Sequence, residues 1–198
     1  MELPELISPD PFETFARWFE AAAASGAPLP ESCTLSTVGL DGSPEARVVL
    51  LKDHGPEGFS FFTNYQSAKG AELEAHPRAA LSFHWAALAW QVRARGEVSR
   101  LPAEASDAYF ATRPRGSQLS AWASAQSREV PDRAALEEAM AAVEARFEGG
   151  PVPRPPHWGG YLLAPEAIEF WIGRADRLHD RVRFERGPEG WIPRRLSP

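Results

Sequence analysis

The sequence predicts an α+β fold that is predominantly antiparallel β, a barrel of strands with helices packed around it. Residues 90–98 alternate apolar and polar side chains, which is typical of a strand with one buried face. Two further strand candidates flank Asp41-Gly42, a dipeptide favoured in the two-residue turns of β-hairpins. Strands and helices do not alternate regularly along the chain, so a doubly wound parallel sheet is not expected.

The first half of the chain begins with a helix and continues mostly as strands. Ser8-Pro9-Asp10-Pro11 is a helix-start signal, and the apolar residues after it recur at helical spacing to about Ala24. Gly55-Pro56-Glu57-Gly58 is a turn, and Pro77 ends a short helix. After the first helix we expect strands over 33–38, 47–51 and 59–63, a helix over 67–75, and strands over 79–85 and 90–98.

The second half is expected to be helical at first and then to return to strands. A helical region covers 102–112, and Asp132 is the expected N-cap of the clearest helix in the chain. A proline-rich connector over 149–156 leads to strands over 161–163, 167–172 and 182–186 and a closing segment over 191–196. Residues 1–10 are expected to form a short N-terminal extension, and 11–198 a single domain, because too little chain follows the connector for a second core. The apolar stripe of the clearest helix comprises Leu136, Ala139, Met140, Val143 and Phe147.

Composition narrows the class of protein. The chain has 198 residues and a net charge of −6, with 43% hydrophobic and 24% charged residues, which is ordinary for a soluble globular domain. An acidic chain is a poor candidate for non-specific nucleic-acid binding. Cys33 is the only cysteine, which excludes an intrachain disulfide and fits a cytoplasmic location. The first residues lack a signal-peptide pattern, and no apolar run approaches the roughly 20 residues that span a membrane.

Several common catalytic motifs are absent from the sequence. It contains no G-x-G-x-x-G after a strand, no Walker loop and no G-x-S-x-G elbow. Its five histidines show neither H-x-x-x-H nor H-E-x-x-H spacing, so no metal site is expected.

The C-terminal segment carries the most informative pattern. An aromatic-rich strand ends in Trp171, and Arg177-Leu178-His179-Asp180-Arg181 follows shortly after it. Two permanent cations, a side chain that changes charge near neutral pH and a large flat ring suit the binding of a planar anionic molecule.

Three other segments offer groups that bind phosphate. Arg47 and Lys52 stand at the two ends of an apolar strand, although a core strand with solvated ends has the same pattern. Thr63-Asn64-Tyr65-Gln66-Ser67-Ala68-Lys69 runs from a strand end into a helix start, which favours a phosphate cradle or an ordinary capped surface helix. Tyr109 and Arg113-Pro114-Arg115-Gly116-Ser117 offer convergent donors, or form a polar turn at a helix end.

From about Pro11 to Pro198 the chain resembles the pyridoxine (pyridoxamine) 5′-phosphate oxidases. Five motifs occur in family order: Arg-x-x-Leu-Leu-Lys from Arg47, Thr-Asn-x-x-Ser-x-Lys from Thr63, Arg-Pro-Arg-x-Ser-Gln from Arg113, the Gln126-Ser127 pair, and the Arg-Leu-His-Asp-Arg tail. One such match arises easily by chance, whereas five in order do not. The resemblance implies an FMN-binding split β-barrel with flanking helices, and a homodimer with FMN at the subunit interface, contacted by both chains.

The resemblance also implies roles for individual residues. Arg47 and Lys69 would bind the FMN phosphate. Arg177 and His179 would be the catalytic pair against the substrate ring. The substrate phosphate would be held by Lys52, Tyr109, Arg113 and Ser117. The other flavin contacts would be Val48, Val49, Leu50, Leu51, Lys52, Phe62, Thr63, Gln91, Gln126, Ser127, Trp171 and Arg181.

The activity that this resemblance implies is an FMN-dependent oxidation. Pyridoxine or pyridoxamine 5′-phosphate would become pyridoxal 5′-phosphate by hydride transfer to the flavin, and O2 would accept the electrons to give H2O2. The amine substrate would also release ammonia. Two alternatives remain: a related split-barrel flavin oxidase acting on a phenazine precursor, and a flavin- or haem-binding module without turnover. The presence of the phosphate-binding set favours the vitamin substrate over the phenazine, and the presence of Arg177 and His179 argues against the module.

Overall fold

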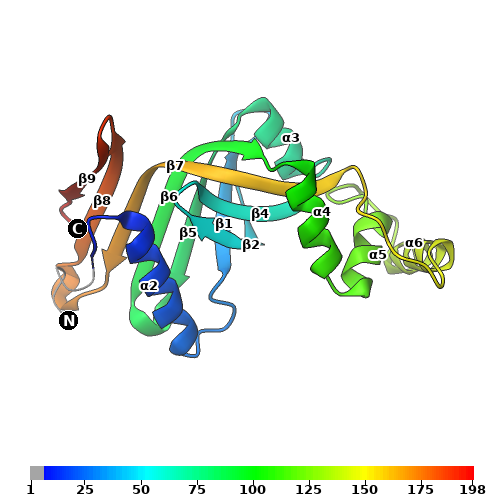
Figure 1. The fold of residues 1–198 in the computed structure, drawn as a ribbon, viewed down its shortest axis with the longest axis horizontal. Helices are drawn as coiled ribbons and strands as arrows, with labels where there is room; N and C mark the ends of the chain where they lie inside the picture. The colour runs from blue at the N-terminus through cyan, green and yellow to red at the C-terminus, as the bar shows by residue number, and fades with distance from the viewer. Residues whose placement is uncertain (1–6) are drawn as a thin grey trace.

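Nine strands form one sheet in which every hydrogen-bonded neighbour pair is antiparallel (Figure 1). The computed structural model describes residues 7–198, so the first six residues of the expected N-terminal extension lie outside the described residues. The strand order is β2-β1-β5-β6-β7-β4-β3, and β8 and β9 continue from β7. The strands are β1 Ser32–Val38, β2 Pro44–Leu50, β3 Asp53–Gly55, β4 Gly58–Asn64, β5 Arg78–Trp85, β6 Trp90–Arg100, β7 Trp158–Ile172, β8 Asp180–Gly187 and β9 Gly190–Arg195.

The two edges of the sheet are joined by the chain itself rather than by hydrogen bonds between two strands. β2 and β3 stand at opposite ends of the strand order, yet only Leu51 and Lys52 separate them in sequence. The Leu51 amide donates to the Glu31 carbonyl at 2.8 Å, and the next amide, of Lys52, donates to the Ser60 carbonyl at 2.9 Å. Two consecutive residues therefore join the two edges, which gives the predicted split barrel. The short strand β3 was not predicted.

The strand β7 corrects the prediction of two strands over 161–163 and 167–172. It runs unbroken through Pro165, where its register with β6 shifts between Arg95 and Gly96. Proline cannot donate to a ladder and so breaks the sequence pattern, but a bulge accommodates it. A Cβ on Gly96 would collide with the Ala164 carbonyl oxygen, so glycine is needed for this close approach.

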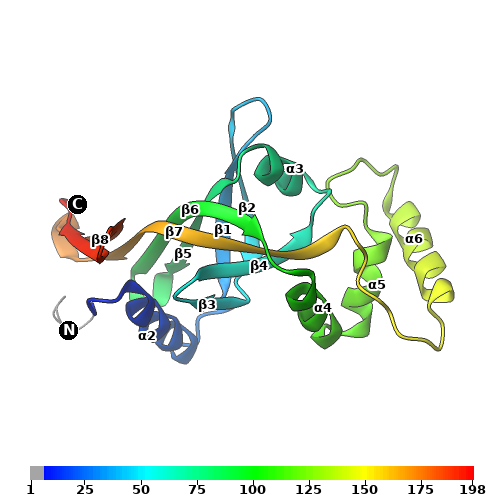
Figure 2. The same ribbon diagram turned by 45° about the horizontal axis from the view of Figure 1, so that its top comes forward.

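One face of the sheet forms the main core. The buried residues of β6, such as Val92 and Ala94, point to it, which confirms the predicted alternation over 90–98. The helix α2 Pro11–Ala24 starts at the predicted signal Ser8-Pro9-Asp10-Pro11, is capped by Asp10 and covers this face (Figure 2). Its Trp18 ring stacks on Trp90 with centroids 4.4 Å apart.

A second, smaller cluster lies at the other end of the molecule. Here α4 Ala103–Thr112, α5 Arg115–Ala123 and α6 Arg133–Arg146 pack beside the first residues of β7 (Figure 2). The predicted N-cap of α6 is confirmed, because the Asp132 carboxylate accepts from the Ala135 amide at 2.9 Å. The helix α5 was not predicted, because it is mostly polar and buries only Leu119 and Ala121. The remaining helix, α3, is Ala68–Ala75.

Replacing Phe15 by alanine should destabilise the protein strongly. Its ring is 0% exposed and meets Phe59, Phe83 and His54 edge-on. We expect the free energy of unfolding, measured by urea denaturation, to fall by about 3–5 kcal/mol. The control Leu40→Ala, at a side chain that is 69% exposed, should change it by no more than about 0.5 kcal/mol. Similar losses in both variants would contradict the placement of Phe15 in the core.

Candidate functional site

A cavity of about 670 Å³ lies between β2, β4 and the helices α4 and α5. The helices approach β4 because Phe62 stacks on Tyr109 of α4, with ring centroids 4.1 Å apart. The structure thus brings together residues of all three segments that were predicted to offer phosphate-binding groups. The predicted residues that line the cavity are Val48, Val49, Leu50, Lys52, Phe62, Thr63, Lys69, Tyr109, Arg113, Ser117 and Gln126.

Other lining residues were missed by sequence reasoning. Asn64 belongs to the 63–69 run, and its position at the end of β4 was the available signal. Ser120 and Ser124 belong to or follow α5, the helix that the sequence pattern did not reveal. Trp158 had no local signal, since only the tertiary fold brings the start of β7 against α4.

Arg113 places a positive charge in the cavity that no carboxylate of the described residues neutralises. Its Nη1 atom is buried without a hydrogen-bond partner. Burial lowers the pKa of this guanidinium from its ordinary value. Its Cζ atom instead lies over the Trp158 ring, 4.6 Å from the centroid. A buried donor without a partner is costly, so this position is suited to an incoming anion.

Lys69 marks a second anion-binding position, at the N-terminus of α3. Its side chain is buried, and Nζ donates to Ser67 Oγ at 3.3 Å and to Gln126 Oε1 at 3.1 Å. Burial, and then the neighbouring cation of Arg47, lower the pKa of the Lys69 ammonium. Ser67 caps the helix by accepting from the Gly70 amide. Two nearby cations at a helix N-terminus suit a phosphate group.

Arg47 is held in place by a buried carboxylate that the sequence analysis missed. Its Nη2 atom lies 2.9 Å from Glu72 Oε2, and its Nη1 donates to Thr37 Oγ1. Thr37 in turn donates to the same Glu72 oxygen at 2.5 Å. Glu72 follows Lys69 by one helical turn, so the helix could have suggested it, whereas Thr37 comes from β1 and carries no sequence signal.

Three residues that the resemblance assigns to the flavin form a row on the face of the sheet opposite the core, which we call the C-terminal row. Gln91 of β6 pairs with Trp171 of β7, which pairs with Arg181 of β8. Directly opposite residues of antiparallel strands point to the same face, so the three side chains are neighbours. The His179 ring lies 4.7 Å from the Trp171 ring.

A second buried carboxylate, Glu169, orients this row. Glu169 Oε1 accepts from Nε and Nη2 of Arg181 at 2.9 and 2.8 Å, and Oε2 accepts from Arg93 Nη2 at 2.9 Å. The Glu169 side chain is only 6% exposed. Glu169 lies two residues before Trp171 and was not predicted as a site residue.

The Arg177 segment has an unusual backbone. Asp176 and Arg177 have φ angles of 56° and 61°, in the left-handed region that favours glycine. The Arg174 amide donates to His179 Nδ1 at 3.1 Å, so a neutral imidazole carries its proton on Nε2. The Arg177 guanidinium is exposed. Such strain is typical of segments that carry function.

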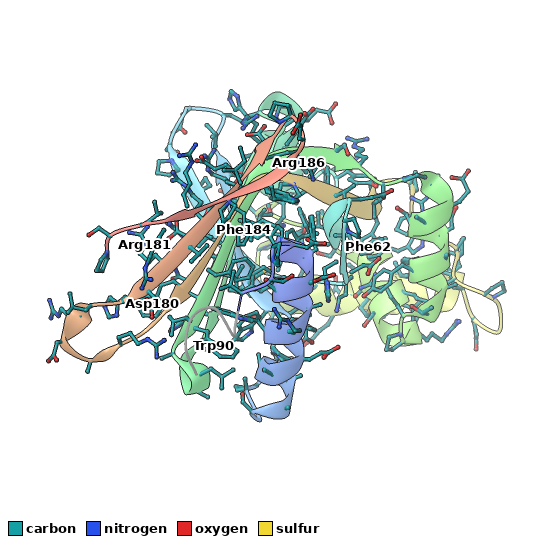
Figure 3. All side chains as sticks on the ribbon, turned by 60° about the vertical axis from the view of Figure 1, so that its left-hand side comes forward. Phe62, Trp90, Asp180, Arg181, Phe184 and Arg186 are labelled. Carbon is teal, nitrogen blue, oxygen red and sulfur yellow. The ribbon has the colours of Figure 1, made fainter. Side chains whose placement is uncertain are left out.

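Within one chain the cavity and the C-terminal row lie far apart. The helices α4 and α5 stand at one end of the long axis and β8 and β9 at the other (Figure 1). Figure 3 shows the same separation between Phe62 and Arg181. Gln91, Trp171, Arg177, His179 and Arg181 do not line the cavity, nor do Arg47, Leu51 and Ser127. Leu51, which follows β2, is buried in the main core. Ser127 is exposed and has a φ of 67°.

The described residues contain neither a metal-binding cluster nor a membrane-spanning helix. Over 7–198, no group of three or more His, Cys, Asp or Glu side chains could hold a metal ion. In the same part of the chain, every helix is too short or too polar to cross a membrane.

Two family models match the chain. Residues 19–147 match the model described as pyridoxamine 5′-phosphate oxidase. The protein belongs to this family. Residues 158–198 match the model of the pyridoxine 5′-phosphate oxidase C-terminal dimerisation region, which covers β7, β8 and β9.

Related proteins agree with this membership. The pyridoxine/pyridoxamine 5′-phosphate oxidase of Cupriavidus necator is 55% identical over 193 residues, which cover 97% of this chain and 91% of that protein. The one from Rubrobacter xylanophilus is 54% identical over 190 residues, which cover 96% and 88%. The chain is therefore an oxidoreductase of the oxidase family.

Solved structures share the fold. PhzG from Burkholderia lata, in complex with tetrahydrophenazine-1-carboxylic acid, superposes with a TM-score of 0.92 at 32% identity, covering 100% of this chain and 98% of that one. A pyridoxamine 5′-phosphate oxidase-related, FMN-binding protein from Nostoc punctiforme gives a TM-score of 0.76 at 16% identity, covering 97% and 100%, which supports the fold alone.

Replacing Lys69 by methionine should stabilise the ligand-free protein. In the folded state the Lys69 pKa is lowered, so the unfolded chain binds that proton more tightly. The cost of the folded cation is present in full below the lowered pKa and disappears as pH rises towards 10.5. We expect Lys69→Met to raise the thermal midpoint at pH 7, with a gain that shrinks at alkaline pH.

The matched control for this prediction is Lys52→Met. Lys52 lines the same cavity, but its side chain is exposed. Its replacement should change stability by no more than about 0.5 kcal/mol at pH 7. A Lys69→Met variant that melts below the parent at pH 7 would contradict the desolvation argument.

Proposed function

We propose that the protein oxidises pyridoxine 5′-phosphate or pyridoxamine 5′-phosphate to pyridoxal 5′-phosphate with FMN as cofactor. O2 is the proposed electron acceptor, giving H2O2, and the amine substrate also releases ammonia. The observation that carries the proposal is the Arg113 guanidinium, which lines the cavity without a carboxylate partner and whose Nη1 atom is buried without a hydrogen-bond partner. Lys52, Tyr109 and Ser117 line the same cavity and add donors that a phosphate ester needs.

The side of the cavity formed by β2 and the start of α3 fits FMN. Lys69, Arg47 and the N-terminus of α3 suit the FMN phosphate, because Lys69 is a buried cation whose pKa an anion would restore. On β2, the apolar side chains of Val48 and Leu50 are 66% and 37% exposed. An exposed apolar strand beside a phosphate position suits the flat, largely apolar flavin ring.

The proposed chemistry divides between cofactor and protein. Bound FMN supplies the hydride acceptor at the substrate's 4′ carbon. The protein orients the substrate: the phosphate contacts fix one end, and Arg177 and His179 act at the ring. His179 is a candidate for moving a proton at Nε2, and the Arg177 cation stabilises negative charge on the substrate.

We infer that one active site combines residues of two chains. The phosphate-binding residues and Arg177 with His179 stand at opposite ends of the chain (Figure 3). A two-fold dimer would bring the cavity of one protomer to the C-terminal row of its partner. The match of 158–198 to a dimerisation region supports this arrangement.

A phenazine precursor is the second candidate substrate. The observation that favours it is the TM-score of 0.92 with PhzG, whose structure holds tetrahydrophenazine-1-carboxylic acid. The donors that accompany Arg113 favour the vitamin candidate, because a phosphate monoester has more acceptor oxygens for Lys52, Tyr109 and Ser117 than a single carboxylate has.

Anaerobic bleaching tests the proposed function. The purified protein loaded with FMN should lose its yellow colour with pyridoxine 5′-phosphate, and should regain it in air with formation of H2O2. Bleaching only with a dihydrophenazine carboxylic acid would favour the second candidate. No bleaching with either compound would contradict both and favour a binding module.

Replacing Arg177 by leucine should separate catalysis from cofactor binding. The variant loses the cation proposed to act on the substrate ring, so the rate of anaerobic flavin reduction should fall at least about a hundredfold. FMN affinity, measured by fluorescence quenching, should change less than about threefold. Arg174→Leu, three residues earlier, serves as a control that should keep most of the rate. Unchanged flavin reduction in Arg177→Leu would overturn the assignment.

A further inference from the structure

Trp158 joins the two sides of the cavity. Its ring stacks on Phe62, with centroids 5.4 Å apart and an interplanar angle of 15°. It lies nearly parallel to Tyr109, at 6.2 Å and 9°. Phe62 belongs to the proposed flavin side and Tyr109 to the proposed phosphate side, so the indole is in contact with both.

The same ring supports the Arg113 guanidinium. Arg113 Cζ lies 4.6 Å from the Trp158 centroid and 5.5 Å from that of Phe110. Two other site arginines are held differently, because Arg47 is bound to Glu72 and Arg181 to Glu169. A carboxylate uses the N–H donors of an arginine and cancels its charge, whereas a ring face does neither.

The backbone of Trp158 is fixed independently of the cavity. Its carbonyl accepts from Arg154 Nη1 at 2.7 Å, and Arg154 Nε donates to Asp107 of α4 at 2.6 Å. The indole ring is 6% exposed and packs edge-on against Phe110. The support beneath Arg113 is therefore rigid before any ligand arrives.

We infer that Trp158 is the positioning residue of the substrate-phosphate site. It holds the Arg113 cation in the cavity by a cation–π contact and leaves the guanidinium donors free for a phosphate monoester. The inference rests on the proposed function, because it assigns the phosphate to Arg113. Trp158 selects for phosphorylated over unphosphorylated ligands through Arg113, without touching the reacting atoms.

Two inert ligands test this role in the FMN-loaded protein. 4-Deoxypyridoxine 5′-phosphate and 4-deoxypyridoxine lack the group that is oxidised and differ only in the phosphate. Calorimetric titration of both gives the Kd of 4-deoxypyridoxine divided by the Kd of its 5′-phosphate. This ratio measures the contribution of the phosphate alone. Trp158→Leu should reduce this ratio about tenfold. Trp158→Phe keeps an aromatic face and should retain most of the ratio.

Trp122→Leu is the matched control. Trp122 belongs to the same cluster and also lies under an arginine, with Arg146 Cζ 4.6 Å from its ring centroid, but it does not line the cavity. It should leave the ratio unchanged even if it lowers the melting temperature. In turnover, Trp158→Leu should raise KM for pyridoxine 5′-phosphate and leave kcat within about twofold.

The outcomes separate this inference from the proposed function. A parent protein that binds both ligands equally would overturn the phosphate site and the inference together. A parent that prefers the phosphorylated ligand, with an unchanged ratio in Trp158→Leu, would overturn the role of Trp158 alone. If Trp158→Leu does not fold, Trp158→Met, which also lacks a ring face, takes its place. An unchanged ratio in that variant would overturn the role of Trp158 as well.

Discussion

The rest of the structure depends on the pairing of β7 with three strands. β6 pairs with β7 from Tyr161 to Ile172, β4 pairs with its first residues and β8 with its last. Trp158 begins the strand and Trp171 stands near its end, and at about 3.3 Å per residue the two lie up to roughly 40 Å apart. One strand thus contributes Trp158 to the cavity and Trp171 to the C-terminal row, and its length keeps the two places apart within one chain.

The cations Arg47, Arg181 and Arg113 are held in different ways. Glu72 and Glu169 are buried acids that hold Arg47 and Arg181 in single orientations, and so determine where those cations point. Arg113 rests on aromatic rings and remains unneutralised. Burying a cation without an acid costs stability, which a structure tolerates where a ligand supplies the missing charge. The same reasoning applies to Lys69, which is buried beside a second cation, Arg47.

Local patterns in the sequence predicted much of the fold. The hairpin at Asp41-Gly42, the alternation over 90–98 and the cap at Asp132 each depend on neighbours in the chain, and the structure contains them. The single strand through Pro165 was not predicted, because only the partner strand reveals the bulge that accommodates this proline. For the site, the phosphate-binding segments were visible as motifs, but Thr37, Trp158 and Glu169 act through contacts between distant segments, which no local pattern records.

A heterodimer of two inactive variants tests the central claim, that each active site takes its phosphate contacts from one chain and its ring contacts from the other. Arg113→Ala and Arg177→Leu chains, co-expressed with different tags and purified through both, would place both defects in one site and leave the other intact. The account predicts about half the turnover of the parent dimer, while each variant homodimer stays inactive. A heterodimer as inactive as the homodimers would contradict it.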